Sequence, residues 1–249
     1  MSMAAPAEFP LSPPQGAGGV PRDRPHLTVV IATSADGKLA DGTGARGRFG
    51  SKADRAALES HVAAADGVLM GGATLRAEGT AMRVIDPAKV QGRCDRGLPP
   101  QPVQIIATRR VDFDPALPFF RQAVPRWLLT DAPGADRWRD RPEFDRAIAA
   151  PTTAAGLDWT CALPMLRQRG IERLAVLGGG RLIGALLLLD AIDELHLTLC
   201  PLLIGGDRAP TAADGPGLPL AAARRLDLVS VQQIDEEVFL SYRRSRNSP

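Results

Sequence analysis

Three consecutive glycines give the strongest chemical signal in the sequence. Gly178, Gly179 and Gly180 lie between an apolar run that predicts a strand and an apolar stretch that predicts a helix. Glycine lets the backbone approach a ligand closely, and the free N–H groups at a helix start favour a phosphate. Arg181 adds a positive charge at the same place. A tight turn without a ligand is the alternative, but three glycines exceed what a turn needs, so we predict an anion site.

Three further segments follow predicted strands, which is where open α/β sheets bind ligands. Ser34 to Lys38 contains an Asp–Gly pair, Met70 to Thr74 contains two glycines, and Thr108 to Arg110 contains two arginines that suit a phosphate. An ordinary Asp–Gly turn and a solvated charged loop are the alternatives for the first and the last. In the first segment, Asp36 or Lys38 is the predicted catalytic group, assisting a proton transfer.

Several other chemistries have no signal in this sequence. The glycine turn lacks the spacing of the dinucleotide fingerprint and the Gly-Lys-Ser/Thr of a Walker loop. His26, His61 and His196 are isolated from one another and from the cysteines in sequence, so no metal site is predicted. A nucleophile elbow and the zinc-deaminase pattern are both missing. Several phosphate sites with few acid–base groups indicate an enzyme whose cofactor carries the chemistry.

The elements that must position these residues alternate between strands and helices. Strands are predicted at 26–32, 67–70, 103–107, 126–129, 173–177, 193–199, 226–231 and 237–242. Helices are predicted from Ser51, which can cap, and at 74–76, 163–169 (with Pro164 in the first turn) and 181–189. Residues 79–102 are expected to form a long loop, and 131–156 show no assignable pattern. This order predicts an α/β fold with a mostly parallel central sheet flanked by helices and an antiparallel strand pair at the C-terminus.

Composition and charge exclude several classes of protein. Lys and Arg number 30 and Asp and Glu 28, for a net charge of +2, so nothing favours a nucleic-acid or membrane-surface partner. The longest apolar run is Ala185 to Leu189, far short of the roughly 20 residues of a membrane span. Three widely spaced cysteines favour a reducing compartment, the cytoplasm. Residues 1–25 are rich in Pro and Gly and are predicted to be a disordered arm before a single domain at 26–249.

The order of these motifs resembles the pyrimidine reductases of riboflavin biosynthesis. The similar stretches are 32–40, 66–75, 103–108 and the segments from Val176 to Pro210, so the resemblance covers about residues 26–243. It implies a dihydrofolate-reductase-like fold and a homodimer, and the missing deaminase pattern implies a stand-alone reductase. In that family NADPH gives a hydride to the sugar C1′ of a ribosylamino-pyrimidine phosphate, which opens the sugar ring.

The resemblance therefore implies an NADPH-dependent reductase of a 5-amino-6-(ribosylamino)uracil 5′-phosphate-like substrate. Two alternatives stay open: a reductase of a pterin-like or other small C=N or C=O compound, and a nucleotide-binding protein without catalysis. The implied cofactor contacts are Ala32, Arg48, Thr74, Glu78, Arg109, Gly178, Gly179, Gly180, Arg181, Leu182 and Ile183. The implied substrate contacts are Arg46, Met82 and Arg83.

Three positions depart from the family's substrate side. Val62 stands where the family has an arginine on the first helix, and Leu177 stands where it has an acidic residue before the glycine turn. Ile85 falls where another arginine is expected, and Arg83 is a displaced substitute for it. Each lost charge-assisted contact to a phosphate costs about 1.5–3 kcal/mol. These departures concern the implied substrate contacts and leave the implied cofactor contacts unchanged.

Overall fold

The computed structural model of the chain describes residues 23–43 and 49–245, so Arg46 and Arg48 lie outside the described residues. The strands of the main sheet are β1 (His26–Ser34), β2 (Gly67–Gly71), β3 (Val103–Ala107), β4 (Arg126–Thr130), β5 (Arg146–Ala149), β8 (Arg173–Val176), β9 (Glu194–Cys200), β10 (Leu226–Ile234) and β11 (Glu237–Arg244). A small separate pair contains β6 (Thr152–Thr153) and β7 (Gly156–Leu157). The helices are α1 (Lys52–Ala64), α2 (Gly72–Glu78), α3 (Pro87–Asp95), α4 (Ala132–Trp138), α5 (Trp159–Arg167) and α6 (Gly180–Leu188), with 3-10 turns η1 (Pro118–Arg121) and η2 (Leu220–Ala222).

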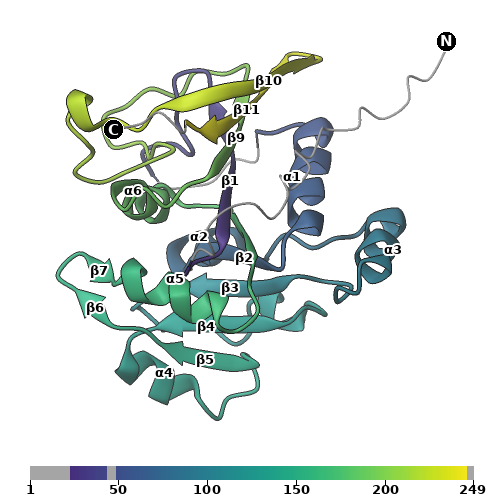
Figure 1. Cartoon of the computed structure of the whole chain (residues 1–249), viewed down its shortest axis with the longest axis vertical. Helices are drawn as coiled ribbons and strands as arrows, with labels where there is room; N and C mark the ends of the chain where they lie inside the picture. The colour runs from purple at the N-terminus through teal and green to yellow at the C-terminus, as the bar shows by residue number, and fades with distance from the viewer. Residues whose placement is uncertain (1–22, 44–48, 246–249) are drawn as a thin grey trace.

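The order of the strands confirms the predicted fold class. Across the sheet it is β10-β11-β9-β1-β8-β2-β3-β4-β5, and every neighbouring pair from β9 to β5 is parallel. β11 runs antiparallel to β9, and β10 runs antiparallel to β11. In Figure 1, α6 and α1 lie on opposite sides of β1. Because β1, β8, β2 and β3 run parallel to one another, their carboxyl ends share one edge of the sheet.

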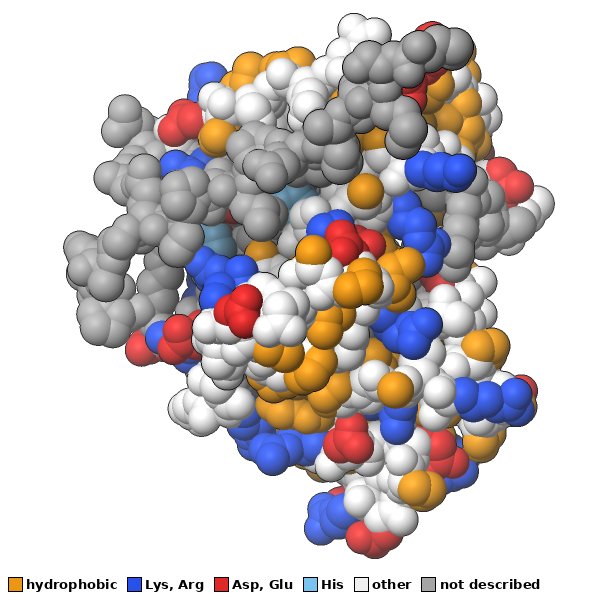
Figure 2. Space-filling model, turned by 90° about the vertical axis from the view of Figure 1, so that its right-hand side faces the viewer, with side chains coloured by type: hydrophobic (Ala, Val, Ile, Leu, Met, Phe, Trp, Pro, Cys, Tyr) orange, Lys and Arg blue, Asp and Glu red, His pale blue; other side chains and the backbone are white. Residues whose placement is uncertain are grey.

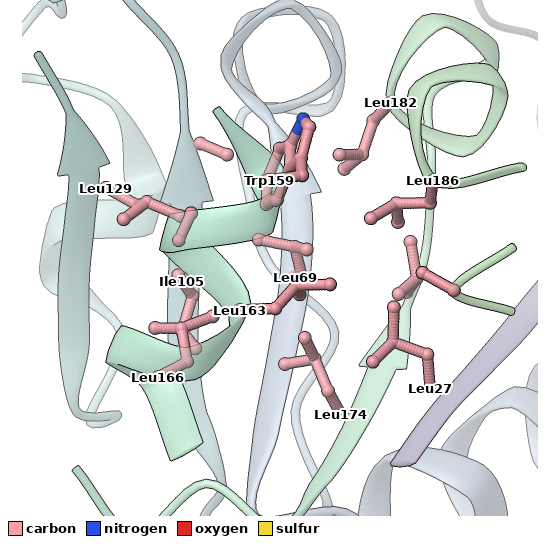
Figure 3. Close-up of a cluster of buried hydrophobic side chains, with 14 of the residues drawn as sticks. Leu27, Leu69, Ile105, Leu129, Trp159, Leu163, Leu166, Leu174, Leu182 and Leu186 are labelled. Atoms are coloured by element: carbon pink, nitrogen blue, oxygen red, sulfur yellow. The ribbon is translucent and has the colours of Figure 1, made fainter. Parts of the chain in front are cut away.

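One face of the sheet is covered by α5 and α6. Figure 3 shows Leu69, Ile105 and Leu129 from three strands pointing toward Trp159, Leu163 and Leu166 of α5, with Leu182 and Leu186 of α6 beside them. All of these side chains are buried. Their alternation along the strands is the period-two pattern of a sheet packed on helices. This core fixes the start of α6 against the end of β8.

The other face carries α1 to α4. Val68 and Ala175 pack with Val62 of α1, while Met70 and Ile106 pack with the aromatic cluster around Trp138 of α4. Figure 2 shows part of the surface on the α1 side, where acidic and basic side chains are interspersed. No helix within the described part of the chain combines the length and the apolar character needed to cross a membrane.

Two predictions about helices are wrong. Residues 79–102 were expected to form a loop, but they contain α3, which Asp86 caps through the N–H of Ala88 and which Pro87 begins. Helix α5 begins at Trp159, capped by Asp158, so Pro164 lies inside the helix instead of in its first turn. In both helices an aspartate cap sets the start. This signal is local and does not depend on apolar periodicity, on which the helix predictions were based.

The arm and the domain meet at Arg24. Its guanidinium donates two hydrogen bonds to the buried Asp193 carboxylate, at 2.6 and 3.0 Å. Asp193 also accepts the N–H of Leu27 at 2.9 Å. Arg24 falls within the segment predicted as a disordered arm, so at least this end of the segment is bound to the domain, while residues 1–22 lie outside the described residues.

Candidate active site

The glycine turn forms the junction between β8 and α6. Gly178 is buried with φ of +96°, a conformation that favours glycine, and the Gly178–Gly179 peptide is cis. The carbonyl of Gly179, the cap of α6, accepts the N–H groups of Leu182 and Ile183 at 2.9 and 3.2 Å. For the N–H groups of Gly180 and Arg181, no acceptor lies among residues 23–43 and 49–245. Two donors at the start of a helix can therefore receive an anion.

Neighbouring strand ends converge on this turn. The N–H of Gly71, at the end of β2, donates to the carbonyl of Gly178 at 2.9 Å. A Cβ built on Gly71 would lie 3.9 Å from the Thr74 hydroxyl and from the Gly179 nitrogen, and one built on Gly178 would lie 3.8 Å from Cδ1 of Ile31 in β1. The structure thus brings together two segments that the sequence predicted separately, the glycine turn and the segment ending at Thr74, with Ile31 of β1 beside them.

The side chains of the other implied cofactor residues differ in how far they are exposed. Arg109, after β3, and Arg181, on α6, are exposed, and Glu78 is the half-buried last residue of α2. The side chains of Leu182 and Ile183 are buried in the core, with 9% and 4% exposed. A contact between either of these two and a cofactor would therefore involve little of its side chain. The assignment of these residues stays a prediction.

A later segment covers one side of α6, and no local pattern of residues predicted this contact. The N–H of Asp214 donates to the carbonyl of Gly180 at 3.0 Å, and the Asp214 carboxylate accepts the N–H and the hydroxyl of Thr211. A Cβ on Gly180 would lie 2.2 Å from the Thr211 carbonyl oxygen, and one on Gly184 would lie 1.9 Å from that of Asp214. Gly180 is therefore required by packing inside the protein as well as by any ligand.

Asp36 holds a loop in place. Its carboxylate accepts the Ser34 hydroxyl at 2.6 Å and the N–H groups of Ile204 and Gly205 at 3.1 and 2.7 Å. The bond from Ser34, followed by those from Ile204 and Gly205, lowers the pKa of Asp36 to about 2. The carboxylate is ionised at neutral pH, so it can orient a group or accept a proton but has none to donate. The ammonium group of Lys38 lies 3.5 Å from the carbonyl of Ala209.

The implied substrate side is apolar. Val62 and Leu177, which replace charged residues of the family, pack in one cluster with Leu58, Met82 and Val84. Val62 and Val84 are 0% and 3% exposed, whereas Arg83 is exposed and Ile85 is 56% exposed. Of the two implied substrate contacts among the described residues, Met82 therefore packs in the apolar cluster, whereas Arg83 is exposed.

The start of α1 lies beside the first residue of β11, Glu237. The predicted cap is confirmed, because the Ser51 hydroxyl accepts the N–H groups of Ala53 and Asp54. The buried Glu237 carboxylate accepts both the N–H and the hydroxyl of Ser51, at 2.8 and 2.5 Å. This contact joins residues far apart in the chain, so no local pattern of the sequence predicted it. In residues 23–43 and 49–245, no group of three His, Cys, Asp or Glu side chains is arranged to hold a metal ion.

Known proteins resemble this chain in sequence and fold. A family model described as the RibD C-terminal domain matches residues 25–240. The chain belongs to this family. The match spans the glycine turn and all the strands whose carboxyl ends surround it, so the resemblance to riboflavin-pathway pyrimidine reductases is confirmed.

Individual relatives agree with the RibD assignment. The 2,5-diamino-6-ribosylamino-4(3H)-pyrimidinone 5′-phosphate reductase of Archaeoglobus fulgidus is 27% identical over 192 residues, which cover 77% of this chain and 87% of that protein. Riboflavin biosynthesis protein RibD of Bacillus amyloliquefaciens is 26% identical over 219 residues, which cover 87% of this chain and 57% of that protein. The solved structure of a pyrimidine reductase-like protein from Corynebacterium diphtheriae has a TM-score of 0.77 at 21% identity, over 90% of this chain and 93% of that one. This likeness confirms the fold.

Proposed function

We propose that the chain is a reductase that uses NADPH to reduce a ribosylamino-pyrimidine 5′-phosphate. The observation that carries the proposal is the glycine turn, where the N–H groups of Gly180 and Arg181 face no acceptor of the described chain and Thr74 lies close by. These groups fit the diphosphate of a dinucleotide, because backbone donors at a helix start favour negative charge. The exposed Arg109, after β3, is the proposed partner of the 2′-phosphate, which distinguishes NADPH from NADH.

The reaction needs a proton as well as a hydride. NADPH supplies the hydride when bound, and a C–H bond forms at C1′ as the bond from C1′ to the ring oxygen breaks. That oxygen then takes a proton. Of the two groups predicted for this task, Asp36 is ionised, whereas the Lys38 ammonium carries protons to donate. We therefore assign proton donation to Lys38 and the positioning of its loop to Asp36.

One observation favours a second candidate substrate. Apolar side chains replace the expected charges at Val62 and Leu177 and pack together. A reductase of a pterin-like or other small C=N or C=O compound would not require a phosphate contact there. The test follows the absorbance of reduced nicotinamide with the pyrimidine phosphate and with a dihydropterin. Turnover of only the dihydropterin would overturn the first candidate, and tight NADPH binding without any turnover would indicate a non-catalytic nucleotide-binding protein.

Substitution of Gly179 tests the placement of the cofactor. The Gly179→Val change is expected to weaken NADPH binding at least about tenfold, because a branched side chain at the cap of α6 would obstruct an anion at the free N–H groups. Titration calorimetry measures the dissociation constant. Gly92→Val is the control, since a Cβ at Gly92 meets open space on α3. Unchanged affinity in the folded Gly179 variant would remove this turn from the proposed site.

We further propose a homodimer through the edge of the sheet at β10. Leu228, Val229 and Val231 are 56%, 46% and 58% exposed on this outermost strand. Exposed apolar side chains on an edge strand favour association with a second chain. The Val231→Lys change is expected to weaken the dimer at least about tenfold, as measured by sedimentation equilibrium. Leu220→Lys, at a residue 93% exposed on η2, should leave the mass unchanged. A monomeric unmodified chain would contradict the proposal.

The proposed compartment is the cytoplasm. Cys94, Cys161 and Cys200 are all free thiols, the first two exposed and the third buried. Exposed free cysteines are suited to a reducing environment. The proposed partners are accordingly a small-molecule substrate, NADPH and a second copy of the chain.

A further inference from the structure

A cavity lies between α6, the sheet and the segment that crosses α6. Leu182 and Leu186 of α6 lie on the side of α5 (Figure 3), whereas Ile183 and Leu187 line the cavity. Residues four apart on a helix share a face, so α6 buries one face against α5 while the adjacent face borders this space. Side chains of β1, β9 and β10 form the other walls.

The cavity has the size and the lining of a site for one small ring. Its volume is about 160 Å³. Apolar protein cavities of about 150 Å³ stay dry and accept benzene. Val29, Ile31 and Leu195 supply aliphatic side chains from the sheet, and the short side chains of Ala212 and Ala213 leave the space unfilled. A ring of six atoms would therefore gain dispersion contacts with these walls.

One end of the cavity carries an excess of positive charge. Asp190, Arg224 and Arg244 are the charged residues of the described chain that line it. Both guanidinium groups share the Asp190 carboxylate, since Arg244 donates to one oxygen at 3.1 Å and Nε of Arg224 lies 3.6 Å from the other. The nearby Asp193 carboxylate, 4.0 Å from Arg244, is bonded by Arg24 at 2.6 and 3.0 Å. Three arginines thus face two carboxylates, which leaves one positive charge for a ligand.

The Arg224 guanidinium has donors without acceptors. It forms no hydrogen bond with the part of the chain that the structure describes, and its Nε is buried beside Asp190. Its two terminal nitrogens are accessible, and the side chain as a whole is 28% exposed. Two N–H groups side by side form the pairing that a carboxylate prefers. An acid bound there would place its carboxylate at the mouth of the cavity and its apolar body inside.

The cavity is separate from the glycine turn. Ile31 and Ile183 line it, and the Cδ1 atom of each lies 3.8 Å from a Cβ built on Gly178. One layer of side chains therefore lies between the cavity and the turn. A ligand in the cavity would not occupy the place proposed for the cofactor.

We propose that this cavity is a binding site for a small apolar carboxylic acid, about the size of benzoate, with its carboxylate on Arg224. A cationic ligand would meet two arginines at the mouth, and an apolar body much larger than one ring would exceed the volume. The site goes beyond the proposed reductase activity, because no residue of the glycine turn takes part in it.

The test follows the isoleucine Cδ1 methyl groups by NMR while benzoate is added. Ile31, Ile183 and Ile192 line the cavity, whereas Ile148 lies on β5. The first three signals are expected to shift with a dissociation constant below about 1 mM, and the Ile148 signal should stay in place. Benzamide has the same shape without the charge, and it is expected to bind at least about tenfold more weakly.

Two substitutions with matched controls test the space and the charge. Ala212→Phe is expected to abolish the shifts because the new ring would occupy the cavity, whereas Ala221→Phe, exposed on η2 and outside the lining, should not. Arg224→Gln is expected to weaken benzoate binding at least about tenfold and to remove its advantage over benzamide. Arg225→Gln, at the exposed neighbouring residue, should change neither.

Three results would overturn the proposal. One is the absence of saturable shifts at the cavity isoleucines; if Ala212→Phe then also changes the mass measured by sedimentation, a second copy of the chain fills the cavity instead. Another is an affinity for benzoate that survives Ala212→Phe or Arg224→Gln in the folded protein. The last is displacement of benzoate by NADP⁺, which would place the acid at the glycine turn. Failure to bind or oxidise NADPH would contradict only the proposed function.

Discussion

The Arg93→Met variant is expected to unfold with a free energy about 3 kcal/mol lower than that of the unmodified chain. Arg93 lies on α3 and is 0% exposed. Its guanidinium donates to the carbonyl oxygens of Ala63, Ala65 and Pro99 at 2.8, 2.6 and 2.8 Å. Methionine fills the space of the aliphatic stem but donates no hydrogen bond. The carbonyls of Ala63 and Ala65, at the C-terminal end of α1, then lose a partner in a place that water does not reach.

Urea unfolding followed by circular dichroism measures this loss. Arg96→Met is the matched control, because Arg96 is exposed and donates a single bond to the same Ala63 carbonyl at 3.0 Å. Its free energy of unfolding should change by less than about 1 kcal/mol. If both variants unfold at the same urea concentration as the unmodified chain, Arg93 does not stabilise the junction between α1 and α3.

The Gly184→Ala variant should lose about 2 kcal/mol of stability, although alanine ordinarily favours a helix over glycine. A Cβ at this position of α6 would lie 1.9 Å from the Asp214 carbonyl oxygen and 2.9 Å from its carbon. Both atoms are backbone, so the segment around Asp214 must move away from α6. The move would also strain the bond from the Asp214 N–H to the Gly180 carbonyl at the glycine turn.

The Gly92→Ala change is expected to have the opposite effect on stability, measured in the same experiment. A Cβ at Gly92 of α3 meets nothing within 4 Å, so the usual helix preference should raise stability by about 0.5–1 kcal/mol. Thermal unfolding of the two variants gives both values. Stabilisation by Gly184→Ala would show that the segment 211–214 does not pack on α6 in solution.

Local patterns in the sequence were enough to predict most of the sheet. Strand 103–107 has the predicted bounds, and the alternating segments at the C-terminus form β10 and β11 as expected. These strands have strong apolar patterns because each strand buries side chains on one or both faces of the sheet. Helix α3 lacks such a pattern: Arg93 is its only buried residue, and Val90 is a partly buried apolar residue that packs on the cluster around Val62. Its cap, Asp86 followed by Pro87, was the available signal.

The candidate site was predictable where a single loop carries it. The glycine turn and the segment ending at Thr74 were found because glycines after strands are visible in one stretch of sequence, and the structure brings them together. The contact of Ser51 with Glu237 and the packing of Asp214 on Gly184 join distant segments. Such pairs depend on the order of strands in the sheet, which local periodicity does not specify.

The position of β1 has a consequence for the order in which the protein can assemble during synthesis. β1 precedes the other strands of the described residues in the chain, yet its two neighbours in the sheet are β8 and β9, which come from the last third of the sequence. Hence its apolar residues Leu27, Val29 and Ile31 remain unpaired until the ribosome has synthesised β8 and β9. The nascent chain should accordingly depend on holding chaperones, and a ribosome stalled before β8 would display an unpaired, aggregation-prone strand.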